Sequence, residues 1–155
     1  MARTAVLAAA LAAVLFLVGC SSLVAGQPAP VSGGSPDADR DLVEAYYTEL
    51  NAAADEGTAS QGRFLRVTQH PDYRDRLCEL GGLTLHVRPA MSTFRSDPEW
   101  VPPEDTRRPR GSVYVLGVSI SIRQQGALLG EQIGSQRVVV LDGRAYGFSP
   151  CPAGG

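Results

Sequence analysis

Three cysteines, two histidines and a scatter of tyrosines are the side chains of this 155-residue chain that could carry chemistry. Cys20 ends an apolar run near the N-terminus, while Cys78 and Cys151 stand far apart in the rest of the chain. A cysteine thiolate can act as a nucleophile or bind a metal, and histidine exchanges protons near neutral pH. The spacing and surroundings of these residues decide which of these reactions the sequence favours.

The spacing argues against a metal site and against the common catalytic motifs. No pair of cysteines or histidines has the separation of metal ligands, and the sequence contains no G-x-S-x-G, H-E-x-x-H, P-loop or dinucleotide-binding motif. His70 precedes Pro71 at an expected helix break, and His86 falls on the polar side of an expected strand. We therefore expect both histidines to be solvated, and we expect no catalytic residue, no metal and no cofactor.

The charge balance argues against nucleic-acid binding. The net charge is −2, and all 14 basic residues are arginine. A chain with this balance is not expected to form the large basic face that binds phosphate backbones.

The N-terminal segment resembles the signal peptide of bacterial lipoproteins. Arg3 precedes an uninterrupted apolar run over residues 5–18, which as a helix spans about 21 Å, short of a hydrocarbon core of about 30 Å. The tetrad Leu17-Val18-Gly19-Cys20 that follows resembles the lipobox of that family. The resemblance implies cleavage after Gly19, a thioether-linked diacylglyceryl group on Cys20, and acylation such as palmitate on the new amine.

Membrane attachment follows from this interpretation. Residues 1–19 are then the signal peptide, and the acyl chains on Cys20 hold the protein on the outer, extracytoplasmic face of the cell membrane. Residues 20–35 carry the lipidated cysteine and a stretch, SSLVAGQPAPVSGGS, whose small residues and prolines are typical of a flexible tether. The alternative is a conventional secretory signal with an incidental cysteine.

Residues 36–155 are expected to form a single α+β domain. Ser35 as N-cap and Pro36 at the first position predict a helix ending at Gly57, and a second helical stretch over residues 58–80 is interrupted at Pro71. Alternating residues then predict strands over 83–88, 112–124, 131–141 and 145–149, with turns at Gln125-Gly126 and Asp142-Gly143. The expected architecture is N-terminal helices packed on a curved antiparallel sheet of about four strands.

The segments LVEAYYTELNAA and VVVLDGRAYGFSPC resemble the long helix and final hairpin of nuclear-transport-factor-two-like proteins, with a cystatin-like domain as the nearest alternative. The resemblance implies a cone whose cavity is lined by the strand face and a helix tyrosine: Tyr46, Tyr114, Leu116, Val118 and Ile120. These residues could equally be core. Isomerase-like and cyclase-like relatives need an acid and a base in that cavity, and this strand face offers no carboxylate.

Two further features concern the mature domain. Cys78 and Cys151 form an even pair in an exported chain, which predicts a disulfide, with a reactive thiol as the alternative. Trp100 lies in a proline-rich loop with Arg107 and Arg108, so this loop could contact a partner, or its tryptophan could fold back on the domain.

The leading hypothesis is a lipid-anchored, non-enzymatic envelope protein that binds a partner protein or a small apolar ligand. The alternatives are a cone-fold enzyme of isomerase or cyclase type and a purely structural envelope component.

Overall fold

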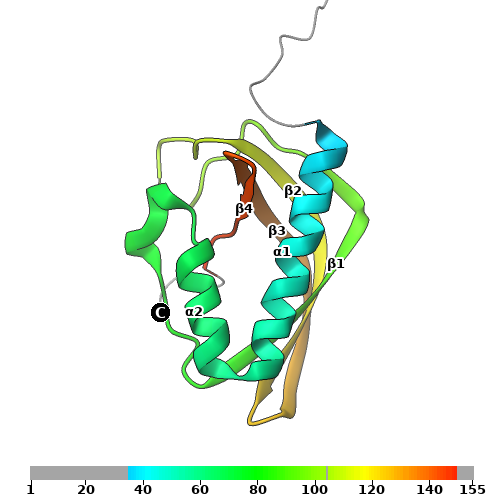
Figure 1. The fold of residues 1–155 in the computed structure, drawn as a ribbon, viewed down its shortest axis with the longest axis vertical. Coiled ribbons are helices and arrows are strands. Elements are labelled where there is room, and N and C mark those ends of the chain that lie inside the picture. The colour runs from blue at the N-terminus through cyan, green and yellow to red at the C-terminus, as the bar shows by residue number, and fades with distance from the viewer. Residues whose placement is uncertain (1–34, 104, 150–155) are drawn as a thin grey trace, which may run out of the picture. The chain divides into compact units, whose positions relative to one another are not determined.

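A computed structural model describes residues 35–103 and 105–149 of the chain. Two helices and a short 3-10 helix come first, and a four-stranded antiparallel sheet follows (Figure 1). The elements are α1 (Pro36–Glu56), α2 (Thr58–Thr68), η1 (Pro71–Arg76), β1 (Leu83–Ser96), β2 (Ser112–Gln124), β3 (Ala127–Leu141) and β4 (Arg144–Tyr146). The predicted α+β fold, with helices packed on a curved sheet, is confirmed.

Helix α1 begins and ends at the predicted residues. The Ser35 hydroxyl accepts a hydrogen bond from the Ala38 N–H, Pro36 occupies the first turn, and Gly57 ends the helix with a φ of 116°. The buried residues of α1 include one carboxyl group, that of Asp39.

The second helical stretch is shorter than predicted. Helix α2 ends at Thr68, η1 ends at Arg76, and the chain up to Gly82 is irregular rather than helical to Leu80. Pro71 supplies the reason, because the residue before a proline is driven to extended backbone and His70 has φ −53° and ψ 132°.

The sheet has the strand order β1-β2-β3-β4, and its two short turns lie where they were predicted. Gln125-Gly126 and Asp142-Gly143 all have positive φ, as two-residue hairpins require. The last strand was predicted over 145–149, but β4 ends at Tyr146. The cause is Gly147, whose carbonyl accepts from the His70 N–H at 3.0 Å and whose N–H donates to the Thr68 carbonyl at 2.9 Å.

Two side-chain amides fasten the helices to the outer edge of β1. The Asn51 amide exchanges two hydrogen bonds of 2.8 Å with the backbone of Val87. The buried Gln61 amide does the same with Leu85, at 2.6 and 2.9 Å, and also donates to the Leu50 carbonyl. The core lies between α1 and the face of the sheet that carries Leu116 and Val118.

Candidate functional site

An apolar groove of about 690 Å³ opens on the helix-facing side of the sheet. Its walls come from β1, β2, β3 and the irregular segment that follows η1. The apolar lining residues are Leu80, Leu83, Leu85, Ile120 and Ile122. Glu79, Gln124 and Gln132 add polar groups, and Cys78 also lines the groove.

The groove exists because the sheet is longer than the helix that covers it. Leu116 and Val118 lie under α1 and are buried, whereas Ile120 and Ile122, further along the same face of β2, are only half-buried. The Asn51 amide of α1 reaches the backbone of Val87, whose register partner in β2 is Ile120. Beyond that level Leu85 is still buried, whereas its register partner Ile122 is only half-buried.

The five predicted cavity residues therefore separate into different surroundings. Tyr46, Leu116 and Val118 are packed in the core together with Val43 and Leu50 of α1, so this part of the interior is filled. Ile120 lines the groove, and Tyr114 lines a separate hollow of about 610 Å³ near the start of α1. These residues were expected either to line a cavity or to be core, and Tyr46, Tyr114, Leu116 and Val118 all belong to the buried core cluster, as the second interpretation has it.

The lining of the groove is mainly aliphatic. Among the described residues that line it, Glu79 is the only carboxylate, and none is a histidine. Within residues 35–103 and 105–149, no cluster of three histidine, cysteine or acidic residues could hold a metal ion. Paired acid and base groups, which isomerase chemistry requires, are not brought together here.

A buried carboxylate lies elsewhere, near the start of α1. Asp39 is 1% exposed, its Oδ2 accepts a 2.6 Å hydrogen bond from the Tyr114 hydroxyl, and its Oδ1 has no partner among the residues described. Burial, followed by the hydrogen bond to Asp39, raises the pKa of Tyr114 to about 12, so the phenol stays neutral and donates. Neither residue lines the groove. The helical stripe Asp39, Val43, Tyr46 and Leu50 was the signal in the sequence for this burial.

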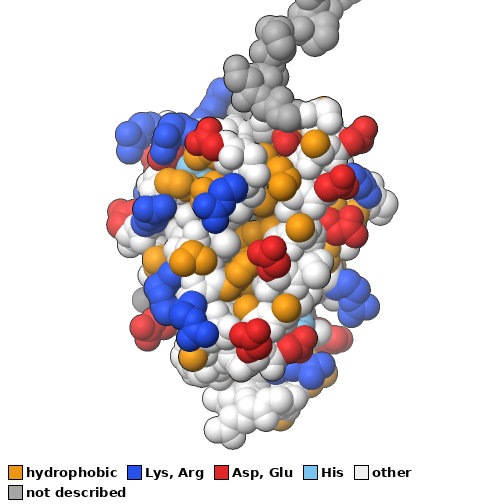
Figure 2. Space-filling model, viewed as in Figure 1, with side chains coloured by type: hydrophobic (Ala, Val, Ile, Leu, Met, Phe, Trp, Pro, Cys, Tyr) orange, Lys and Arg blue, Asp and Glu red, His pale blue; other side chains and the backbone are white. Residues whose placement is uncertain are grey.

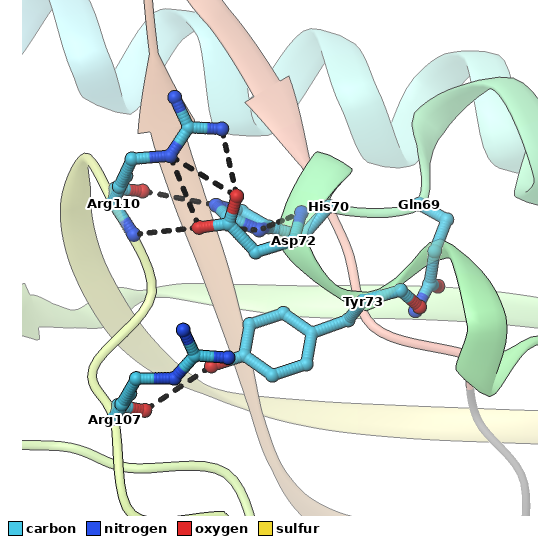
Figure 3. Close-up of polar contacts among 6 residues, drawn as sticks. All are labelled: Gln69, His70, Asp72, Tyr73, Arg107 and Arg110. Carbon is cyan, nitrogen blue, oxygen red and sulfur yellow. Dashed lines mark hydrogen bonds and ion pairs between the residues drawn. The ribbon is translucent and has the colours of Figure 1, made fainter.

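The expectation that His70 is solvated was wrong, because its side chain is completely buried. Its Nε2 lies 2.9 Å from the Arg110 carbonyl, and its Nδ1 accepts from the Asp72 N–H at 3.2 Å (Figure 3). The ring of Phe148 stacks on the imidazole. A carbonyl can only accept a hydrogen bond, so Nε2 carries a proton. Because Nδ1 accepts from an N–H, it carries none, and the ring is neutral. Burial lowers the pKa of His70, which also favours the neutral ring. Both ring nitrogens are engaged in hydrogen bonds to the backbone. His70 is therefore a structural clamp and not a proton carrier.

Neighbouring bonds fasten the same region to the β1–β2 loop. Arg110 donates to both carboxylate oxygens of Asp72, at distances down to 2.7 Å, and this interaction lowers the pKa of Asp72 (Figure 3). The Tyr73 hydroxyl donates to the Arg107 carbonyl at 3.1 Å. His86, in contrast, is partly exposed as expected, with Nε2 3.7 Å from the Asp55 carboxylate.

The loop carrying Trp100 folds back on the domain, which is the second of the two alternatives for it. The indole and the ring of Phe148 form a T-shaped pair with centroids 4.8 Å apart. The guanidinium carbon of Arg137 lies over the indole, 5.5 Å from its centroid. Arg107 and Arg108 are exposed, and Arg108 pairs with Glu99. Figure 2 shows arginine and acidic side chains interspersed on one face of the molecule, a pattern that does not favour polyanion binding there.

Cys20 and Cys151 lie outside the described residues, so lipidation and the Cys78–Cys151 disulfide stay predictions. Cys78 itself is partly buried beside the groove. Among the helices of residues 35–149 none is long and apolar enough to cross a membrane.

Comparison of the chain with protein-family models, curated proteins and solved structures finds no match.

Proposed function

We propose that this is a lipid-anchored, extracytoplasmic and non-enzymatic protein whose domain binds a small apolar ligand. The observation that carries the proposal is the groove, which is open, mainly apolar and formed by three strands of the sheet and the segment that follows η1. Small-molecule sites commonly have volumes of about 300–1,000 Å³, apolar walls and a few polar groups that set orientation. The groove, with a volume of about 690 Å³, has all three properties.

The lining residues indicate the chemical class of the ligand. Leu83, Ile120 and Ile122 offer a branched aliphatic floor that suits an acyl chain or another elongated hydrocarbon. The amides of Gln124 and Gln132 can hydrogen-bond hydroxyl or carbonyl groups of such a molecule. Anchoring by acyl chains on Cys20 would keep the groove near a membrane, which is a source of such ligands.

Titration with the fluorescent apolar probe N-phenyl-1-naphthylamine tests the proposal. Ile122→Gln places an amide in the groove at a half-buried position, so the probe should bind at least about tenfold more weakly, equivalent to about 1.4 kcal/mol. Val67→Gln, on an exposed position of α2, is the matched control and should leave binding unchanged. Equal binding by all three proteins, or no saturable binding by the wild type, would refute the groove as the site.

A partner protein is the second candidate, and the β2–β3 hairpin rather than the Trp100 loop favours it. Leu128 and Leu129, beside the hairpin turn, are more than half exposed. Exposed apolar side chains contribute little to the stability of the domain and are typical of a contact surface. Photo-crosslinking from position 128 in intact cells should then capture a protein that the Leu129→Ser variant loses. The isomerase- or cyclase-like alternative needs an acid and a base that converge in the groove. Among the described residues that line the groove, only Glu79 carries a carboxyl or imidazole group.

A further inference from the structure

The hollow of about 610 Å³ beside the start of α1 is a second concave site on the domain. Its lining comes from the end of β1, the loop between β1 and β2, and the beginning of β2, and Pro36 of α1 adds to the wall. Among the described residues, none lines both this hollow and the groove. The hollow is therefore a separate place in which a small molecule could bind.

Rigid apolar rings form much of the wall of this hollow. Phe94 and Tyr114 stack on each other, with centroids 4.5 Å apart and ring planes 18° from parallel. Three proline rings add to the apolar surface, those of Pro36, Pro98 and Pro109. Proline rings have almost no conformational freedom to lose when a ligand packs on them, and aromatic rings offer large flat surfaces. Such a wall suits a planar apolar ring.

The charge on the lining of the hollow is positive. Among the described residues that line it, Arg95 and Arg108 are charged and none is acidic. Arg108 pairs with Glu99, whereas Arg95 makes no ion pair with a described residue. The Asp39 carboxylate, which accepts from the Tyr114 hydroxyl, is buried and is not part of the lining. Because a guanidinium group binds planar or tetrahedral anions through several N–H groups, the lining favours an anionic group on the ligand.

The later residues of the β1–β2 loop that line the hollow lie between two fastened positions, Arg107 and Arg110. The Arg107 carbonyl accepts a hydrogen bond from the Tyr73 hydroxyl at 3.1 Å (Figure 3). Arg110 is held through its carbonyl by His70 and through its guanidinium group by Asp72. The bonds around His70 therefore hold this wall of the hollow in place.

Both ends of the same loop are fixed to the sheet. The Asp97 N–H donates to the Val113 carbonyl at 2.9 Å, and the Asp97 carboxylate accepts from Arg137 at 3.2 Å. Gly111 lies so close to β3 that a Cβ at this position would be 2.6 Å from the Val140 carbonyl oxygen. The hollow is therefore preformed, so a ligand that enters it does not have to order the loop.

We propose that this hollow binds an aromatic anion, meaning a molecule with a planar apolar ring and a carboxylate, sulfonate or phosphate group. The ring packs against the prolines and the Phe94–Tyr114 pair, and the anionic group accepts hydrogen bonds from Arg95, with Arg108 as a second donor. The site is additional to the apolar groove, and it gives the bonds around His70 a role in holding a binding site.

Two fluorescent probes that differ by one sulfonate group separate this site from the groove. The anionic probe, 1-anilinonaphthalene-8-sulfonate, is N-phenyl-1-naphthylamine with an added sulfonate. Both are titrated against the full chain in the same mild detergent, and the signal of detergent alone is subtracted. Arg95→Gln should weaken binding of the anionic probe at least about fivefold and leave the neutral probe unaffected. Arg88→Gln is the matched control, because Arg88 is an exposed arginine of the same strand that lines neither the hollow nor the groove.

Ile122→Gln supplies the reverse comparison, because Ile122 lines the groove and not the hollow. This variant should keep the affinity of the wild type for the anionic probe, whatever it does to the neutral one. If the anionic probe is weakened by Ile122→Gln and not by Arg95→Gln, it binds in the groove, and the second site is overturned. No saturable binding of the anionic probe by the wild type, or equal weakening by Arg95→Gln and Arg88→Gln, would overturn it as well. The neutral probe reports on the groove independently in every case.

Discussion

His70 gives the sharpest test of how the domain is held together. Replacing His70 by Phe keeps an aromatic ring to stack on Phe148 but removes the bonds to the Arg110 carbonyl and the Asp72 N–H. Two lost bonds cost about 2 kcal/mol, and leaving the two backbone groups unsatisfied raises the cost to as much as about 4 kcal/mol. Small domains are stable by about 5–15 kcal/mol, so this loss is easily measured.

The pH dependence carries a second signature. Burial lowers the pKa of His70 in the folded chain below the 6.5 of the unfolded chain. The clamp therefore contributes its full stability above pH 6.5 and loses it as the pH falls from 6.5 toward the folded pKa, because only the unfolded state gains the proton readily. The difference in stability between wild type and His70→Phe should be largest at pH 7.5 and should shrink toward pH 5.

Urea unfolding at both pH values measures these differences. His86→Phe is the control, because His86 is partly exposed and makes only a 3.7 Å contact with the Asp55 carboxylate at the surface, worth less than about 1 kcal/mol. If His70→Phe unfolds at the same urea concentration as the wild type at pH 7.5, the description of His70 as a buried clamp is wrong. A stability difference that grows as the pH falls would refute the linkage argument.

Three further predictions concern other parts of the chain. Cys20→Ala should abolish incorporation of labelled fatty acid and membrane retention, and unchanged retention would rule out the anchor. Non-reducing peptide mapping should recover Cys78 linked to Cys151, whereas two free thiols would count against a bridged, exported domain. Gln61→Met should lower the free energy of unfolding by about 3 kcal/mol, because the buried N–H and C=O of Leu85 lose their partner; hydrogen exchange at the Leu85 amide should accelerate accordingly.

Local signals in the sequence were sufficient for most of the fold. Ser35, Pro36 and Gly57 fix the ends of α1 by their own backbone chemistry, and the Asp142-Gly143 turn aligns β3 with β4. The alternating residues of β2 separate the two faces of the sheet without reference to any other element. Each of these predictions rests on interactions between residues close in sequence.

Contacts between distant segments were beyond the reach of such patterns. His70 contacts Arg110 of the β1–β2 loop and Phe148 after β4, both of which lie far from it in the sequence. The sequence around Gln61 gives no sign that it is buried, because its burial depends on contact with the edge of β1, which comes later in the chain. The groove depends on how far α1 extends over the sheet, which is a matter of packing. The sequence predicted Ile120 as a cavity residue, and Ile120 lines the groove, but the sequence did not predict where the groove opens.

The most direct test of the proposed function is to identify what the protein carries. The full chain and its Ile122→Gln variant should be purified from their own host in the same mild detergent, and organic extracts should be compared by mass spectrometry. The proposal predicts an apolar compound recovered at about one molecule per wild-type chain and depleted at least about tenfold in the variant. Equal recovery from both proteins, or no compound above the detergent background, would contradict it.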